Sequence, residues 1–208
     1  MIEENGFGVR VMARRGGEDV LDRNGRKYVG LDSGTEYQLE LINNRDTMCD
    51  ALVELEGERV GLWRIYAHDS IVIERPADTK RKFTFFDEDS PEAIEAGVRK
   101  GSSLNGLVKV TFYPKKRRAK LVYETASRSI GHEEGMEFRT EYTSGSTVLG
   151  DRSYQEFRVI APLRPDEIDW SLVTELIFRL VAKDKESRYV SIGNRNRRPA
   201  RSRYPPRI

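Results

Sequence analysis

The residues of this chain that could do chemistry are concentrated at its C-terminal end. Residues 187–208 contain seven arginines and no lysine, aspartate or glutamate. A guanidinium group is a planar set of donors that binds carboxylates, carbonyl oxygens and phosphates through paired hydrogen bonds. We therefore expect residues 187–208 to form an extended basic arm that docks on a partner. The residues expected to contact that partner are Arg188, Arg195, Arg197, Arg198, Arg201, Arg203, Arg207 and Tyr204.

The arm has too few apolar residues to offset the entropy cost of ordering by itself, so its order would depend on the partner. A neighbouring protein surface is the favoured partner, because the prolines Pro199, Pro205 and Pro206 stiffen the arm into an extended docking segment. Nucleic acid is the second alternative, and a tail without a binding role is the third.

Catalytic and metal-binding patterns are weak in the rest of the chain. The two histidines, His68 and His132, have no metal-type spacing, and the single cysteine, Cys49, excludes a multi-cysteine zinc site. The glycine-bounded segments 101–106 and 145–150 lack the lysine of a phosphate-binding loop and are predicted to be turns. The sequence therefore predicts a protein that is not an enzyme and that binds no metal or cofactor.

Two acidic segments offer alternatives to this prediction, as a calcium site and as a catalytic site. Residues 87–89 could bind calcium, but they lack the glycine and terminal glutamate of an EF-hand loop. Asp166, Glu167 and Asp169 could supply paired carboxylates for sugar hydrolysis, although any acidic loop would offer as much. Solvated acidic turns are the favoured interpretation of both.

Charge is distributed unevenly along the chain. The whole sequence has 36 basic and 34 acidic residues, but residues 1–186 have 29 basic residues against 34 acidic ones. An acidic body argues against a domain that wraps nucleic acid with its own surface, since phosphate contact needs clustered positive charge. The sequence shows no apolar run long enough for a membrane span, and its one cysteine fits a reducing compartment.

Short alternating segments separated by turn residues dominate residues 1–186 and predict an all-β domain. The clearest strand is 36–41, in which Tyr37, Leu39 and Leu41 share one face. The other predicted strands are 9–13, 27–31, 51–55, 59–63, 71–75, 82–86, 107–112, 120–124, 154–160 and 175–182. Residues 175–182 also fit a helical period, so a helix is the alternative there. Ser90 and Pro91 predict the start of one short helical insert.

These elements predict an antiparallel β-sandwich over residues 1–186, with a single jelly roll as the favoured topology and the arm, 187–208, as an appendage. No internal repeat is apparent.

The order of the motifs resembles a known family. The segments are KYVGLDSGTEYQLELINN, ALVELEGERVGLWRI, IVIERP, RKFTFF, GLVKVTFYP, GSTVLGDRSYQEF and IFRLVAK. Together they resemble a β-sandwich family of large icosahedral double-stranded DNA viruses of algae and protists, over about residues 26–184. The resemblance implies a single jelly roll that serves as a penton or minor capsid protein in the virion, assembled in the host cytoplasm. It also implies a homo-oligomer, with a pentamer expected, and contacts to neighbouring capsid proteins.

Three functions are therefore compared. The first is the structural capsid protein, the second is a nucleic-acid-binding adaptor that uses the arm, and the third is a glycan-binding sandwich. The third would need aromatic platforms, for which Trp63 and Trp170 are the candidates, but both are predicted to lie in the core.

Overall fold

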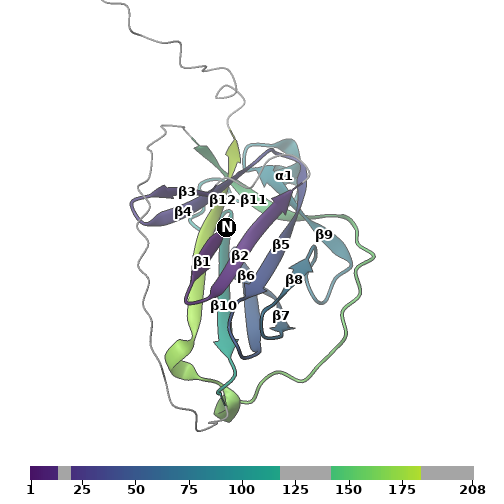
Figure 1. The fold of residues 1–208 in the computed structure, drawn as a ribbon. Coiled ribbons are helices and arrows are strands. Elements are labelled where there is room, and N and C mark those ends of the chain that lie inside the picture. The colour runs from purple at the N-terminus through teal and green to yellow at the C-terminus, as the bar shows by residue number, and fades with distance from the viewer. Residues whose placement is uncertain (14–19, 118–141, 184–208) are drawn as a thin grey trace, which may run out of the picture.

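The structure, a computed structural model, describes residues 1–13, 20–117 and 142–183 (Figure 1). The strands are β1 (Ile2–Glu4), β2 (Phe7–Ala13), β3 (Val20–Arg23), β4 (Arg26–Leu31), β5 (Thr35–Asn43), β6 (Cys49–Leu55), β7 (Glu58–Ile65), β8 (Asp69–Ile73), β9 (Arg81–Asp87), β10 (Leu107–Pro114), β11 (Tyr142–Arg152) and β12 (Thr174–Lys183). The helical elements are α1 (Pro91–Glu95) and two 3-10 turns, η1 (Pro165–Glu167) and η2 (Trp170–Leu172). The predicted strand 120–124 lies outside the described residues.

The strands form two facing layers, which confirms the predicted all-β sandwich (Figure 1). The first layer contains β1, β2, β5 and β8, and the second has the order β7, β6, β10, β12, β4, β3. Strand β11 joins the layers, because residues 142–144 pair with β12 and the remainder pairs with β9, which in turn pairs with β5. The pairing is antiparallel throughout the described strands except between β12 and β4, which are parallel.

The core lies between the two layers and is built by the alternation that the sequence predicts. In β5, Tyr37, Leu39 and Leu41 are buried while the residues between them are partly exposed. The Phe7 ring of β2 stacks on the Phe112 ring of β10, with ring centroids 4.8 Å apart, so the layers are in direct contact. Cys49 is fully buried, and desolvation raises the pKa of its thiol to about 12.

The β6–β7 hairpin fixes the position of β11. Its two-residue turn has positive φ at Glu56 and Gly57, which is the type I′ geometry that suits strand twist. The Glu56 carboxylate accepts hydrogen bonds from the backbone N–H of Gly106 at 3.0 Å, the N–H of Thr147 at 2.8 Å and the Ser146 hydroxyl at 2.7 Å. One side chain in a tight turn therefore holds the start of β10 and the middle of β11 together.

Two local predictions are confirmed. The helix α1 begins where expected, since the Ser90 hydroxyl accepts a hydrogen bond from the Ala93 N–H at 3.2 Å and Pro91 occupies the first turn. Residues 174–183 form a strand rather than a helix, because β12 pairs with β10 on one edge and with β4 on the other.

Two predictions are wrong. Residues 154–160, predicted as a strand, have no strand partner and run as irregular chain. Residues 145–150, predicted as a turn, lie inside β11. The glycines of β11 serve close packing, because a Cβ at Gly145 would lie 2.1 Å from the Phe85 ring and a Cβ at Gly150 would lie 1.9 Å from the Thr84 hydroxyl.

The Glu56 contacts predict a large stability loss in Glu56→Asn, compared with Glu58→Asn as its control. Asparagine suits the positive φ of this turn position, so the loss reports the missing hydrogen bonds and not the turn. We expect Glu56→Asn to lower the free energy of unfolding by about 3 kcal/mol, measured by urea denaturation, and Glu58→Asn to change it by less than about 0.5 kcal/mol. Equal effects of the two variants would contradict the role assigned to Glu56.

Candidate functional site

The arm predicted to bind a partner lies wholly outside the described residues. This holds for each of its residues, namely Arg188, Arg195, Arg197, Arg198, Arg201, Arg203, Arg207 and Tyr204. The arm therefore stays a prediction, and the candidate site described below is a different surface.

That surface starts with an irregular segment that closes one side of the sandwich. We name residues 153–164 the strap and residues 165–172 the base. The strap leaves the end of β11 and descends along the β7 and β8 side of the molecule, at the right of Figure 1, to reach η1. Strands β7 and β8 are the outermost strands of their layers on this side, and exposed strand edges carry backbone groups that need hydrogen-bond partners.

Gln155 supplies those partners for β8. Its side-chain nitrogen donates to the Val72 carbonyl at 2.7 Å, and its side-chain oxygen accepts from the Glu74 N–H at 3.1 Å. The amide of one side chain thus takes the place of a neighbouring strand. The adjacent Ser153 is buried, and its hydroxyl donates to the Glu74 carboxylate at 2.6 Å.

Arg75 binds the strap at Gln155. Its guanidinium is buried and donates twice to the Gln155 carbonyl, at 2.9 and 2.7 Å. The same group lies over the Phe157 ring, 4.3 Å from the centroid, and that ring meets the edge of Trp63 at 5.6 Å. A charged, fully engaged side chain and an aromatic contact therefore attach the middle of the strap to β7.

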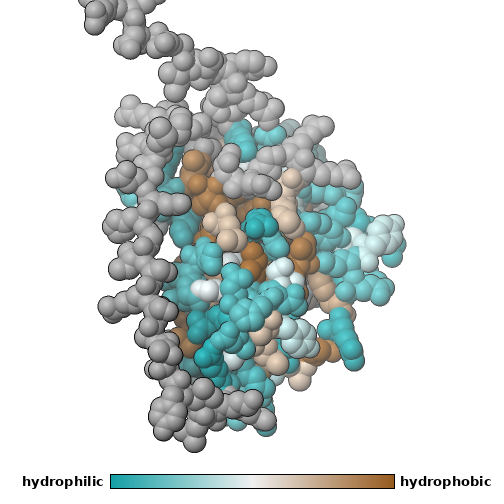
Figure 2. Space-filling view, in the orientation of Figure 1, coloured by the Kyte–Doolittle hydropathy of each residue, from teal (hydrophilic) through white to brown (hydrophobic). Residues whose placement is uncertain are grey.

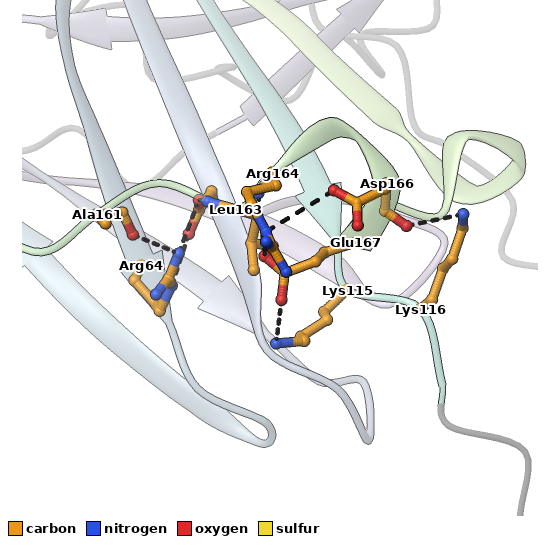
Figure 3. Close-up of polar contacts among 9 residues, drawn as sticks. Arg64, Lys115, Lys116, Ala161, Leu163, Arg164, Asp166 and Glu167 are labelled. Carbon is orange, nitrogen blue, oxygen red and sulfur yellow. Dashed lines mark hydrogen bonds and ion pairs between the residues drawn. The ribbon is translucent and has the colours of Figure 1, made fainter.

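The lower strap is attached by a partly buried ion pair between neighbouring strands (Figure 3). The Asp50 carboxylate of β6 accepts from Arg64 of β7 at 2.8 and 3.1 Å, and from the Leu163 N–H at 2.6 Å. Arg64 also donates to the Ala161 carbonyl at 3.0 Å, and its hydrogen bonds with Asp50 raise the pKa of its guanidinium. Both charges are thus satisfied while they hold two points of the strap.

The base carries the three carboxylates that could serve in sugar hydrolysis, and each of them has a local contact; that of Asp166 is an ion pair with Arg164 at 3.8 Å. Glu167 binds Lys115 at 2.9 Å, and the Asp166 carbonyl accepts from Lys116 at 2.9 Å (Figure 3). The Asp169 carboxylate accepts from the Ser171 hydroxyl at 2.6 Å. The contacts of Lys115 and Lys116 join the base to the end of β10, and the Asp169 bond lies within the base.

The strap and base also concentrate exposed apolar surface. Eleven large apolar side chains are exposed in the described part of the chain, and five of them lie between residues 154 and 172. They are Tyr154, Val159, Ile160, Trp170 and Leu172. So many exposed apolar side chains on one segment make the strap and base a candidate interaction surface.

The two tryptophans differ in location. Trp63 lies in the core at 7% exposure, as predicted, but the prediction for Trp170 is wrong, because its side chain is 58% exposed. Trp170 stays at the surface because its indole nitrogen donates to the Pro165 carbonyl at 3.0 Å and its ring leans on Tyr113.

The outer face of the first layer has a different character. Arg10 and Glu40 form an ion pair of 2.8 Å on neighbouring strands there, and Ser70 donates to the same glutamate at 3.1 Å. Figure 2 shows this face as a mixture of hydrophilic and hydrophobic residues without one continuous apolar area. The strap and base carry five of the eleven exposed large apolar side chains of the described residues, which makes them the candidate for a protein contact.

A hollow of about 510 Å³ beside β5 and β9 contains charged groups that could carry out acid–base chemistry. It contains Lys82, 2.9 Å from Glu36, and Glu74, which accepts from Ser153 and from Gln38. The bond from Ser153 lowers the pKa of Glu74, and the bond with Glu36 raises the pKa of Lys82. Acid–base catalysis at neutral pH is favoured by shifts in the opposite directions, and these groups fit a structural role, since Lys82 is paired with Glu36 and Glu74 is held by two hydrogen bonds.

Within residues 1–13, 20–117 and 142–183, no group of histidine, cysteine, aspartate and glutamate side chains is arranged to hold a metal ion. In the same ranges no helix has the length and apolar character that a membrane crossing requires. His68 lies at the surface beside Asp46, at 2.9 Å, and His132 lies outside the described residues.

No known protein family, curated protein or solved structure matches this chain.

Sequence reasoning missed the residues that hold the strap, namely Asp50, Arg64, Arg75 and Gln155. A signal was available for two of them, because Asp50 and Arg64 are each a charged residue between apolar neighbours, as with Asp50 between Cys49 and Ala51. A buried charge needs a partner, but the sequence does not say which one.

The Asp50 contacts predict the effect of its removal. Asp50→Ala leaves the Arg64 guanidinium and the Leu163 N–H without their acceptor, and we expect a loss of about 3–5 kcal/mol in the free energy of unfolding. The control is Asp166→Ala, whose side chain is 74% exposed, with an expected change below about 0.5 kcal/mol. Urea denaturation measures both. An Asp50→Ala protein as stable as the control would show that the ion pair does not hold the strap.

Glu167 predicts a pH dependence of stability. The Lys115 ammonium, with the Arg164 N–H, lowers the pKa of Glu167 from 4.5 to about 2. A carboxyl whose pKa is lowered by folding stabilises the fold above its unfolded value, and this contribution is lost as the pH falls from 4.5 toward 2. Glu167→Gln should therefore be less stable than the wild type at pH 7, with the difference shrinking between pH 4.5 and 2. Urea titrations at several pH values measure this, and a pH-independent difference would exclude it.

Proposed function

We propose that this chain is a structural protein of an icosahedral capsid, a penton or minor component in the virion, with assembly in the host cytoplasm. The observation that carries the proposal is the exposed apolar surface of the strap and base on a firmly attached edge of the sandwich. The resemblance of its motif order to viral single jelly rolls supports the same conclusion. The single jelly roll is part of the proposal, and the parallel pair β4–β12 is a departure from the antiparallel form of that topology.

The strap and base suit contact with a second copy of this chain. Val159 is 95% exposed and Ile160 44%, so both present apolar area that water would leave on association. The surface is attached by Asp50, Arg64 and Arg75 through hydrogen bonds that are partly or fully buried, so little order has to be gained on binding. In a closed ring of five copies, each subunit would place this edge against one neighbour and a different surface against the other.

The charge distribution supports an added tether. Residues 1–186 have five more acidic than basic residues, and residues 187–208 add seven arginines. An arm of this charge would be attracted to the acidic body of a neighbouring copy, and the attraction would weaken with salt. Binding through the arm to a neighbouring capsid protein of acidic surface follows the same chemistry.

The second candidate function is the nucleic-acid-binding adaptor, favoured by the arginines of the arm alone. It predicts binding whose affinity falls steeply with salt and disappears with the arm. The third, a glycan-binding sandwich, gains one observation from the structure, since the exposed Trp170 against Tyr113 is an aromatic surface on which a sugar could stack.

Light scattering on the purified full-length chain, at low and high salt, tests the first candidate. We expect a discrete oligomer, a pentamer in the simplest case. Val159→Asp should weaken association by roughly tenfold or more, because it places a charge in the contact, whereas Ile94→Asp on α1, 64% exposed, should leave the mass unchanged. Circular dichroism checks that both variants fold.

A matching chain with residues 187–208 removed tests the arm. Loss of the salt dependence of assembly supports the tether. A monomer at all salt concentrations, with no effect of Val159→Asp or of arm removal, would contradict the proposal. Loss of nucleic-acid binding with the oligomer intact would favour the adaptor.

A further inference from the structure

The middle of the strap alternates like a β-strand. Gln155 and Phe157 contact the sandwich, the first at the β8 edge and the second at the Trp63 ring. Glu156 and Arg158 follow them in turn and are exposed. Side chains that alternate between two faces are typical of extended chain. Residues 155–158 therefore have the side-chain arrangement of a strand, although they pair with no described strand.

The backbone of the same stretch has hydrogen-bonding capacity to spare. The strap is attached on both sides of it, through the Gln155 carbonyl, the Ala161 carbonyl and the Leu163 N–H. Within the part of the chain that the structure describes, no residue exchanges a hydrogen bond with the backbone of residues 156–160. An extended segment with N–H and C=O groups in this condition is an edge to which another strand can add.

A second copy of the same segment is restricted to a few registers on that edge. Two identical strands related by a two-fold axis perpendicular to their ribbon run antiparallel, and each residue contacts its counterpart reciprocally. Residues that lie opposite one another must also face the same side of the ribbon. The pair is therefore centred on one residue, which lies opposite its own copy.

Charge selects the central residue. With Phe157 at the centre, Glu156 lies opposite Arg158 of the partner subunit, and the reciprocal pair forms on the other side of the axis. The exposed Tyr154 and Ile160 are then opposite one another as well. With Glu156 or Arg158 at the centre, two like charges would meet, which is unfavourable. A shift by one further residue in either direction pairs neither charge with its opposite.

The side chains of the strap are suited to this pairing. Among the described residues, neither Glu156 nor Arg158 has an ion-pair or hydrogen-bond partner. Val159 follows the two-residue period onto the face of Phe157, yet it is 95% exposed, because it extends beyond the packed part of the strap. In the pair it would lie opposite Gln155 of the partner subunit, where its apolar surface leaves water.

We propose that two copies of this chain associate by pairing residues 154–160 as antiparallel strands about a two-fold axis at Phe157. The inference rests on the self-association proposed above and names its contact residues and its symmetry. A two-fold contact doubles whatever unit it joins, so the strap links a chain to a chain or a ring to a ring. The base is then left for the neighbour within a ring.

Charge reversal tests the register on the full-length chain. Glu156→Arg places two arginines opposite one another at both sites, and Arg158→Glu places two glutamates there. We expect each variant alone to associate at least about tenfold more weakly than the wild type in sedimentation velocity. An equimolar mixture of the two variants should recover association to within about threefold of the wild type, because each mixed pair restores both unlike contacts. The double variant should recover it in the same way.

Glu95→Arg and Arg99→Glu are the matched controls. Both residues are exposed, at the end of α1 and just after it, and the charge changes are the same. We expect each to change association less than about twofold. Circular dichroism checks that all variants fold. Hydrogen exchange of the amides of residues 156–160 should slow with rising concentration in the wild type, and not in Glu156→Arg.

The outcomes separate this inference from the capsid proposal. Single variants that associate like the wild type, or a mixture that does not recover, would overturn the strap pairing, while an intact oligomer would leave self-association standing. A wild type that is monomeric at every concentration would contradict both. Association that ignores the charge reversals and disappears when residues 187–208 are removed would identify the arm as the occupant and overturn the pairing.

Discussion

The open side between the outer strands β7 and β8 is the constraint on which much of this structure depends. A sandwich of two separate layers leaves strand edges with unpaired backbone groups, and these must be hydrogen bonded or covered. Here the cover is an irregular strap whose Gln155 amide replaces the missing neighbour of β8. Side-chain chemistry thus does what another strand would do, which leaves the outer surface of the strap available for other contacts.

The cost of using charged groups for this attachment is offset by several hydrogen bonds to each group. Burial of the Asp50 and Arg64 charges would be unfavourable alone, but the carboxylate receives three hydrogen bonds and the guanidinium reaches a backbone carbonyl as well. Arg75 is satisfied by backbone carbonyls instead of a carboxylate. A strap held by such groups has a defined position, which is what a surface for repeated, identical contacts requires.

Backbone carbonyls also orient an arginine toward the opposite edge of the second layer, but there the arginine does not attach the strap. There the guanidinium of Arg179 is also oriented by backbone carbonyls, but it faces a hollow and not a packed segment. Arginine is therefore used in two ways in the fold: to close a gap within the chain, and to line a hollow. The two uses differ in what the guanidinium group faces. Arg64 faces the Asp50 carboxylate and Arg75 faces the Gln155 carbonyl of the strap, whereas Arg179 faces the hollow.

The sequence by itself determined the all-β class, the buried face of β5, the turn after Leu55 and the start of α1, because each depends on residues near one another in the chain. Tertiary structure decided the rest. Residues 154–160 alternate like a strand but lack a ladder partner, and β12 is a strand only because β10 and β4 flank it. The local sequence pattern does not show which distant segments pair with each other. It also does not show that Trp170 would contact Pro165 and Tyr113 at the surface. The convergence of Arg23, Tyr28 and Arg179 around the hollow beside β12 was likewise invisible until the register of β12 and β4 was known.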